Sequence, residues 1–313
     1  MIGIQDVGIY IPTRIESNYD KVKKFSIDKV FIENKIGFRS ISRKDENETS
    51  SDLCIKALAN LQARVSINLD DVDFVCVCTQ NPDYLIPQTS AILHGRLGLS
   101  KSCASFDISL GCSGWVYGVN ISKSFMVANG YKKGLFFTSD SYSEIVSHED
   151  KNTDLLFGDG AAVTLLSHDS VYEIGKASFG TDGCEYEALI KKNTEPLFMN
   201  GRSIFNFVLK HIPALVDECL KRNQITLQEI DLCLFHQASK IVLSSIEKKL
   251  KLESGCMPFV AGDYGNTVSS SIPIALQSYI GDNTIRNIMT CGFGVGLSMA
   301  AITLKRINEK EDK

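Results

Sequence analysis

Short apolar runs that alternate with stretches of helical periodicity constrain the fold of this chain more than any other feature. Runs such as DFVCVCT (73–79) and NIMTCGFG (287–294) consist mainly of apolar or small residues. A strand that is apolar on both faces must be covered by helices on both faces, which is typical of a largely parallel sheet in an α/β protein. The sequence therefore predicts an α/β fold around a largely parallel, helix-covered sheet.

The same order of strands and helices occurs twice along the chain, which indicates two similar halves, 1–168 and 169–313. The joint would lie in SHDS, which interrupts the apolar pattern. The first half has strand or helix patterns at 2–12, 50–65, 73–79, 104–109, after Cys112, at 134–140 and at 161–166. The second half has them at 171–178, about 203–222, 230–237, about 239–250, 259–265 (FVAGDYG, in the position of a strand), 269–280, 287–294 and 297–306.

Composition excludes several classes of protein. The formal charge of -4 arises from 33 basic and 37 acidic residues that are mixed along the chain, so no nucleic-acid partner is expected. No apolar run approaches the roughly 20 residues that span a membrane, and no basic segment precedes the first apolar stretch as in a signal peptide. The ten cysteines show no CxxC pair. These features predict a cytoplasmic protein with reduced thiols, no metal and no membrane partner.

The stretch DISLGCSGWVYGVN places Cys112 where an apolar strand turns into a helical pattern. A helix that begins at or just after Cys112 would point unpaired backbone N–H groups at the sulfur, and its dipole would favour the thiolate. Gly111 and Gly114 would allow a tight turn and the close approach of a substrate. The alternative is a buried cysteine packed at a turn, which is the common situation for this residue type.

Two further stretches carry polar residues where ligand chemistry often occurs. His236 follows the apolar run IDLCLF, at the carboxyl end of a strand, and Asn266 lies in the glycine-bearing loop GDYGNTVSSSIP before a helix pattern. Each has an ordinary structural explanation when taken singly: a hydrogen-bonded histidine at a strand end, and an asparagine in a turn or N-cap.

Together, Cys112, His236 and Asn266 resemble the ketoacyl-acyl carrier protein synthase III group of the thiolase-like superfamily. The three residues stand in the family's order, in DISLGCSGWVYG, HQAS and GDYGNTVSSSIPIAL. Further matching motifs run from end to end of the chain: IGFR near Arg39, FGDGAAV at 157–163, MNGRSIF at 199–205 and CGFGVGLSMAA at 291–301. The resemblance implies a thiolase-like fold, with two duplicated halves in a five-layered α-β-α-β-α core, and a homodimer.

The resemblance also implies a role for each matching residue. Cys112 would attack an acyl thioester and become an acyl-enzyme. The backbone N–H of Cys112 and that of Val295, or of its neighbour Gly294, would form the oxyanion hole. His236 and Asn266 would polarise a malonyl-type thioester while it loses carbon dioxide, and the enolate would attack the acyl group. Coenzyme A or phosphopantetheine thioesters would be substrates, and no tightly bound cofactor would be required.

Some positions depart from the family's pattern. Fatty-acid starter enzymes hold adenine between tryptophan and arginine, and this chain has Phe31 and Lys151 at those positions. Lysine lacks the planar guanidinium group, so weaker binding of adenine between the two side chains is expected. After the HQA motif stand Ser239 and, two positions later, Ile241 in place of a docking arginine. Phe205 is a further expected substrate-binding residue by motif position. These departures favour a specialised pathway over housekeeping fatty-acid synthesis.

Two kinds of partner are implied by the resemblance. The segment NPDYLIPQTSAILHGRLGL resembles the family's dimer interface, where Ile86 or Pro87 would reach the acyl pocket of the other subunit. A carrier protein could dock on a basic face formed by Lys240, Lys248, Lys249 and Lys251. Acyl-coenzyme A would be the alternative donor.

Two other functions remain open from the sequence. One is acyl transfer from Cys112 to an alcohol or amine, with His236 as general base. The other is a noncatalytic partner in a dimer. Retention of Asn266 favours condensation over acyl transfer, and the intact set of three residues argues against a noncatalytic role.

Overall fold

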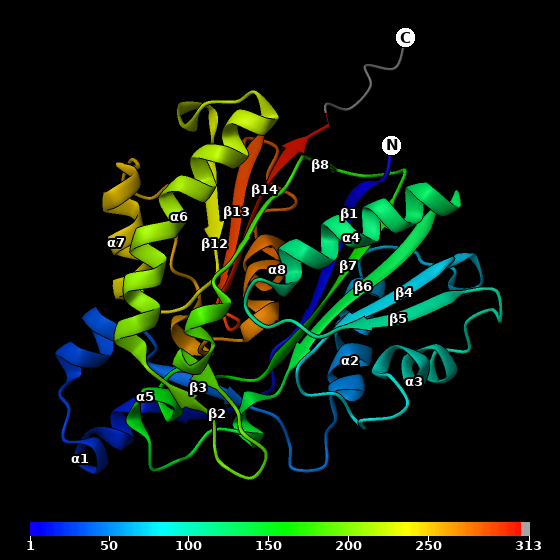
Figure 1. Ribbon diagram of the computed structural model, residues 1–313. Coiled ribbons are helices and arrows are strands. Elements are labelled where there is room, and N and C mark those ends of the chain that lie inside the picture. The colour runs from blue at the N-terminus through cyan, green and yellow to red at the C-terminus, as the bar shows by residue number, and fades with distance from the viewer. Residues whose placement is uncertain (308–313) are drawn as a thin grey trace.

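The computed structural model describes residues 1–307, which form layers of helices around a ten-stranded mixed sheet (Figure 1). The last residues of the expected second half, 308–313, lie outside the described residues. The strands follow the order β12-β13-β14-β8-β1-β7-β6-β4-β5, and β9 also pairs with β14. We call β1, β7, β6, β4 and β5 the first half-sheet, and the remaining strands of this sheet the second half-sheet.

The strands of the first half-sheet are β1 (Gly3–Tyr10), β4 (Phe74–Cys78), β5 (Ala104–Ile108), β6 (Lys133–Asp140) and β7 (Gly160–Ser167). Those of the second half-sheet are β8 (Tyr172–Ile174), β9 (Ser178–Thr181), β12 (Leu232–Phe235), β13 (Asn287–Gly294) and β14 (Ser298–Arg306). Two small ribbons lie outside this sheet: β2 (Arg14–Ser17) with β3 (Ser40–Arg43), and β10 (Leu189–Ile190) with β11 (Phe198–Met199).

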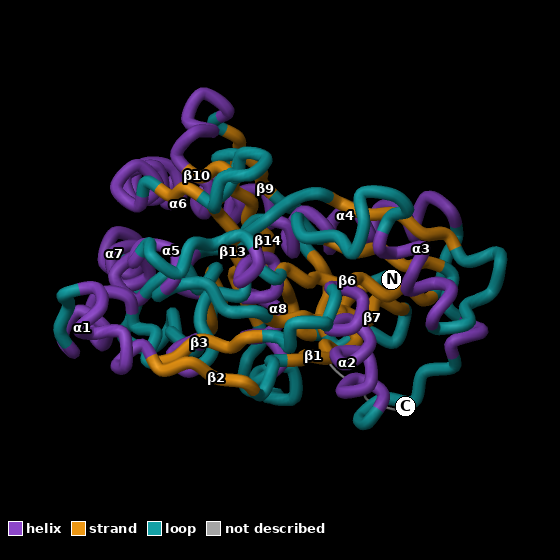
Figure 2. The backbone as a smooth tube through the Cα atoms, turned by 90° about the horizontal axis from the view of Figure 1, so that it is seen from below, coloured by secondary structure: helices purple, strands orange, loops and turns teal. Residues whose placement is uncertain are grey.

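The helices complete five layers in the order α-β-α-β-α (Figures 1 and 2). One outer layer consists of α2 (Ser50–Gln62) and α3 (Thr89–Arg96), which pack on the first half-sheet. The central layer consists of α4 (Gly114–Asn129) and α8 (Ser271–Gln277), which contact strands of both half-sheets. The other outer layer consists of α6 (Gly201–Asn223), which packs on the second half-sheet, and α7 (Lys240–Leu250), which packs on α6. Two short helices are α1 (Val22–Phe25) and α5 (Lys151–Asp154).

The sheet is mixed, so the expectation of a largely parallel sheet was wrong. Only the pairs β4–β5, β4–β6 and β12–β13 are parallel, and the other pairs within the large sheet are antiparallel. The apolar runs indicate that helices cover both faces of the sheet, because a buried strand needs apolar side chains whichever way it runs. They carry no information on strand direction.

The segment FVAGDYG is not a strand. It contains the 3-10 turn Ala261–Asp263. Its backbone carbonyls accept hydrogen bonds from β3 and from the residue that precedes β3. Arg39 N–H donates to the Gly262 carbonyl (2.6 Å), and Ser42 N–H donates to the Tyr264 carbonyl (2.9 Å). Gly265 has φ +87°, in the left-handed region that favours glycine. The loop therefore packs across β3, and this course brings Asn266 to the carboxyl edge of the sheet.

Candidate active site

Cys112 lies in a tight turn between the carboxyl end of β5 and the first turn of α4. A side chain at Gly111 would lie 2.5 Å from the Val295 side chain and 2.6 Å from the Gln80 amide oxygen, so only glycine fits this close approach. A side chain at Gly114 would overlap the sulfur of Cys78. The expected strand-to-helix turn is present, and α4 begins two residues after Cys112.

The ionisation of Cys112 differs from the sequence-based expectation. Burial and the nearby carboxylate of Asp140 raise the pKa of the Cys112 thiol to about 12, although the backbone N–H groups of Val295 and of Cys112 itself act to lower it. Loss of hydration therefore outweighs the helix start in the free protein. The resemblance assigns the N–H of Cys112 and that of Val295, or of its neighbour Gly294, to an oxyanion hole.

Gly294 brings β13 unusually close to Cys112. An added Cβ at this position would stand 2.9 Å from both Cβ and Sγ of Cys112. A glycine here leaves room for the sulfur of Cys112, which gives a physical reason for a glycine at this end of β13.

His236 is held at the carboxyl end of β12 with its ring in a fixed position. Its backbone N–H donates to the Cys291 carbonyl (2.9 Å), and its ring stands edge-to-face with that of Phe293 at 5.6 Å between centroids. Its Nδ1 lies 2.7 Å from Oγ of Ser271. Burial lowers the pKa of His236 to about 3, so the imidazole is neutral at neutral pH.

Asn266 is fixed by both its backbone and its side chain. Its N–H donates to the Leu156 carbonyl (2.8 Å), and its own carbonyl accepts from the Gly158 N–H (3.0 Å). Its Oδ1 accepts from the N–H of Val268 (2.9 Å), which has φ +52°, a strained conformation for a β-branched residue. The amide nitrogen then lies 3.4 Å from Nε2 of His236.

These residues open onto one cavity of about 690 Å³. Cys112, His236, Asn266 and Gly294 line it together, so the structure brings together side chains that are far apart in the sequence. Most of the remaining lining is apolar, which suits a thioester chain with few charges. The expected substrate-binding residues Phe31, Phe205 and Ser239 also line this cavity.

Lys151, in contrast, is exposed at the start of α5 and is not among the lining residues. The cation beside Phe31 is Lys35, whose Nζ lies 5.7 Å from the ring centroid, on the π-helical turn Phe31–Ile36. Sequence reasoning missed Lys35, although its spacing of four residues from Phe31 in FIENK is a signal for one helix face. It also missed Arg202, a second cation that lines the cavity, although this residue belongs to the MNGRSIF motif.

The expected dimer residues lie on the surface. Ile86 is 87% exposed, and Tyr84, Leu85 and Pro87 beside it are exposed as well. Neither Ile86 nor Pro87 lines the cavity of its own subunit. Four consecutive exposed residues that are mainly apolar are unusual on a protein surface outside a contact site.

Asp140, at the end of β6, is a buried carboxylate near the site. It accepts hydrogen bonds from the N–H of Gln80 (2.7 Å) and from the N–H and hydroxyl of Ser269. Burial raises the pKa of Asp140 to about 6, and these hydrogen bonds limit the shift. Asp140 thereby connects the end of β4 to the turn Val268–Ser270 that follows Asn266.

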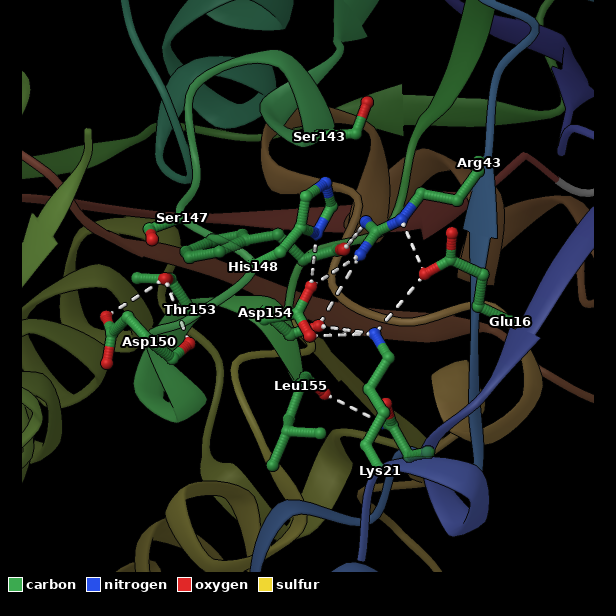
Figure 3. A network of polar contacts seen from close by, with 12 residues as sticks. Glu16, Lys21, Arg43, Ser143, Ser147, His148, Asp150, Thr153, Asp154 and Leu155 are labelled. Atoms are coloured by element: carbon green, nitrogen blue, oxygen red, sulfur yellow. Dashed lines mark hydrogen bonds and ion pairs between the residues drawn. The ribbon is translucent and has the colours of Figure 1, made fainter. Parts of the chain in front are cut away.

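A network of ion pairs around Asp154 lies close to residues 156–158 (Figure 3). The buried carboxylate of Asp154 lies 2.9 Å from Lys21 Nζ and 3.3 Å from Arg43 Nη2. Glu16 pairs with the same two cations, at 3.3 and 3.2 Å. Burial opposes ionisation of Glu16, but the charges of Arg43 and Lys21 outweigh it and lower its pKa. His148 Nδ1 reaches Asp154 from the solvent side at 2.8 Å.

This ion-pair network supports the site through the backbone. Arg43 Nη1 donates to the Phe157 carbonyl at 2.7 Å. The neighbouring Leu156 carbonyl and Gly158 N–H are the backbone partners of Asn266, and Leu156 and Phe157 line the cavity. The network therefore fixes the segment against which Asn266 is aligned.

In the part of the chain that the structure describes, residues 1–307, no group of three or more His, Cys, Asp or Glu side chains is placed to hold a metal ion. None of the helices in this part of the chain has the length and apolar character needed to cross a bilayer.

Comparisons with known proteins agree with the resemblance. Residues 106–183 match the family model of 3-oxoacyl-[acyl-carrier-protein] synthase III, and residues 220–306 match the model of its C-terminal part. The beta-ketoacyl-[acyl-carrier-protein] synthase III of Caldanaerobacter subterraneus subsp. tengcongensis is 30% identical over 97% of both chains, and that of Streptococcus sanguinis is 30% identical over 96% of this chain and 97% of the relative.

Solved structures show the same likeness. A crystal structure of a 3-oxoacyl-(acyl-carrier-protein) synthase III superposes with a TM-score of 0.92 at 32% identity and covers 98% of this chain and 99% of the other. The beta-ketoacyl-[acyl-carrier-protein] synthase III of Thermus thermophilus gives a TM-score of 0.91 at 28% identity, over 98% of this chain and 100% of the other. The chain thus has a thiolase-like fold and belongs to the 3-oxoacyl-[acyl-carrier-protein] synthase III family of condensing acyltransferases.

Proposed function

We propose that this protein joins an acyl group, carried on Cys112, to a malonyl-type thioester by decarboxylative Claisen condensation. One observation carries the proposal: a thiol from the first half and two polar side chains from the second half, His236 and Asn266, line the same cavity. Condensation needs a nucleophile that stores an acyl group and donors that stabilise an enolate. The three residues supply both requirements.

In the first step, the sulfur of Cys112 attacks the carbonyl carbon of an acyl thioester. The bond between that carbon and the donor's sulfur breaks, and the donor leaves as a thiol with the proton that Cys112 releases. The backbone N–H groups of Cys112 and Val295 or Gly294 hold the oxyanion of the tetrahedral intermediate. Because burial raises the pKa of Cys112, entry of the substrate must accompany loss of the thiol proton.

In the second step, a malonyl thioester loses carbon dioxide. The carbon–carbon bond to its carboxylate breaks, and the electron pair forms an enolate whose oxygen accepts hydrogen bonds from His236 and Asn266. The enolate carbon then attacks the acyl carbonyl on Cys112, the carbon–sulfur bond breaks, and the sulfur is protonated again. A neutral His236 suits this role, since a charged ring would bind the malonyl carboxylate and oppose its loss.

The donor's carrier group would enter past Phe31, Lys35 and Arg202 of the lining. Two cations suit the phosphates of coenzyme A or phosphopantetheine. Lys35→Met should raise KM for a coenzyme A donor about three-fold, in line with loss of one exposed ion pair between lysine and phosphate. The matched control is Lys151→Met, which should leave KM unchanged; the reverse result would restore Lys151 to the site.

An acyl carrier protein is the proposed macromolecular partner. Lys248, Lys249 and Lys251 are exposed at the end of α7, whereas Lys240 donates to the Glu33 carbonyl (2.9 Å) and helps to fix the cavity entrance. We also propose a homodimer in which residues 84–87 form part of the contact, with Ile86 or Pro87 at the partner's acyl pocket. The ten free cysteines support a location in the reducing cytoplasm.

The experiment that tests the function is intact-protein mass after incubation with acyl-coenzyme A and acyl-carrier-protein donors, for the wild type and Cys112→Ala. A mass increment in the wild type that vanishes in the variant would establish the acyl-enzyme and identify the donor. No increment with any donor would contradict the proposal and favour the noncatalytic dimer partner. Efficient use of acetyl-coenzyme A would contradict the specialised pathway that the sequence departures favour.

A further inference from the structure

The neutral ring of His236 carries one proton, which resides on either Nδ1 or Nε2. The position of this proton decides the chemistry of the cavity. A proton on Nε2 makes the ring a hydrogen-bond donor to a thioester oxygen. A proton on Nδ1 leaves Nε2 as a base that could activate an alcohol or amine, which is the rival acyl-transfer function.

Ser271, the first residue of α8, is the group that faces Nδ1. Its Oγ lies 2.7 Å from Nδ1, the two side chains are buried, and the Gln237 N–H also points to this oxygen at 3.5 Å. The serine hydroxyl has one proton to donate, and among the described residues Nδ1 is the acceptor that the hydrogen-bond geometry provides for it. If Nδ1 carried the proton instead, this buried hydroxyl would lose its acceptor.

The position of Asn266 is compatible with this assignment. Its Oδ1 is engaged by the Val268 N–H, so the amide NH₂ group faces His236 Nε2. The distance of 3.4 Å between the two nitrogens is longer than an ordinary N–H hydrogen bond. Two neighbouring donors that do not bond well to each other are suited to share one acceptor oxygen, as an enolate or thioester carbonyl would provide.

We propose that Ser271 is a positioning residue that donates its hydroxyl proton to Nδ1 and so keeps His236 in the Nε2–H form. This inference rests on the proposed function and deepens it. The cavity then presents two donors, from His236 and Asn266, and no imidazole base, which selects condensation over acyl transfer to an alcohol or amine.

The first test is nitrogen-15 NMR of the histidine rings in the substrate-free protein at neutral pH, with His236→Gln used to assign the His236 signals. The expected result is a protonated Nε2 in the wild type and a shift of the population toward protonated Nδ1 in Ser271→Ala. Ser270→Ala is the matched control, because the Ser270 hydroxyl bonds to Thr138 and not to His236. A protonated Nδ1 in the wild type would overturn the assignment.

The second test separates the two steps of the reaction. Ser271→Ala should acylate Cys112 at the wild-type rate, whereas release of carbon dioxide from a malonyl thioester should fall roughly tenfold, as expected for loss of one hydrogen bond that selects the tautomer. Ser271→Thr, which keeps the hydroxyl, should recover most of the decarboxylation. Decarboxylation at the wild-type rate in Ser271→Ala would overturn the proposal.

The two tests also separate this inference from the proposed function. The NMR measurement needs no substrate, so it supports or overturns the tautomer in either case. A wild-type protein that shows protonated Nε2 but forms no acyl-enzyme would count against condensation and still support the role of Ser271 in holding the ring.

Discussion

Two buried polar regions meet at residues 156–158, and they keep their polar groups in place by opposite means. In the ion-pair network, the charge of Asp154 is balanced by Lys21 and Arg43 at 2.9 and 3.3 Å. In the cluster of Cys112, His236 and Asn266, burial raises the pKa of Cys112 and lowers that of His236, so both groups are neutral. The ion-pair network fixes the backbone with paired charges, whereas the cluster around Cys112 keeps neutral groups that can still bond to a substrate.

The difference teaches what each region can do. The charges of a buried ion pair already bond to each other, so few of their hydrogen bonds remain for a ligand. Removal of one partner leaves the other as an uncompensated buried charge. Neutral donors without a strong partner retain hydrogen bonds for a substrate, which then develops the charge itself. Removal of a proposed catalytic group should therefore affect rate far more than stability, and removal of a charge of the ion-pair network should do the reverse.

The largest expected effect is on rate. His236→Ala or Asn266→Ala should lower malonyl decarboxylation by roughly 10²–10³-fold, because each removes a donor to the enolate oxygen. Acylation of Cys112 should change only a few-fold. Carbon dioxide release and intact mass measure the two steps separately. Equal losses in both steps would show that the variants disturb the whole cavity and would break the distinction.

The largest effect on stability should come from Asp154→Asn. The buried cations, with the Arg43 side chain 4% exposed, would face a neutral amide, so the free energy of unfolding should fall by about 3–5 kcal/mol. Urea denaturation measures this change. The matched control is the double variant Arg43→Met, Asp154→Leu, which should lose less because Lys21 and Glu16 remain paired with each other and only the exposed His148 loses its partner. A single variant as stable as the wild type would refute the structural role of the network.

A pH series should separate the neutral groups from the charged ones. The pKa of His236 is about 3 when folded, below its ordinary value, so acidification through pH 6.5 to 3 protonates the unfolded chain first and destabilises the fold. The pKa of Asp140 is about 6, above its ordinary value, so acidification from pH 6 to about 4 protonates the folded state first and stabilises it. Between pH 6 and 4 the two effects oppose each other.

Single variants should therefore change the pH dependence in opposite directions. From pH 6 to 4, the unfolding free energy of Asp140→Asn should fall more steeply than that of the wild type, and that of His236→Gln less steeply, each by up to about 1.4 kcal/mol per pH unit. Denaturant titrations across this range give the slopes. Parallel slopes in all three proteins would mean that burial does not shift these groups.

The smallest effect is expected at the edge of the network. The His148 side chain is 60% exposed although it pairs with Asp154. His148→Ala should change the free energy of unfolding by less than about 0.5 kcal/mol, because solvent screens such a contact. A loss as large as that of Asp154→Asn would place His148 among the structural charges and require a larger network.

Much of the fold could be predicted from local sequence, and sequence motifs also singled out the three residues that are proposed to act at the site. The apolar runs located β4, β6 and β12, and the glycines around Cys112 located the turn into α4. The direction of the strands could not be predicted, because a strand covered on both faces has the same composition whichever way it runs. The loop conformation of segment 259–265 could not be predicted either, because its course depends on backbone hydrogen bonds to the chain around β3.

The sequence by itself determined which segments are buried, and its motifs indicated that Cys112, His236 and Asn266 act together. Only the tertiary structure decided their chemical state: the protonated thiol, the neutral imidazole, and the contact of Ser271 with Nδ1. It also placed Lys35, and not Lys151, beside Phe31. The physical reason is that hydration and hydrogen bonding depend on groups brought together from distant parts of the chain, whereas burial patterns and turns depend on residues that are close in the sequence.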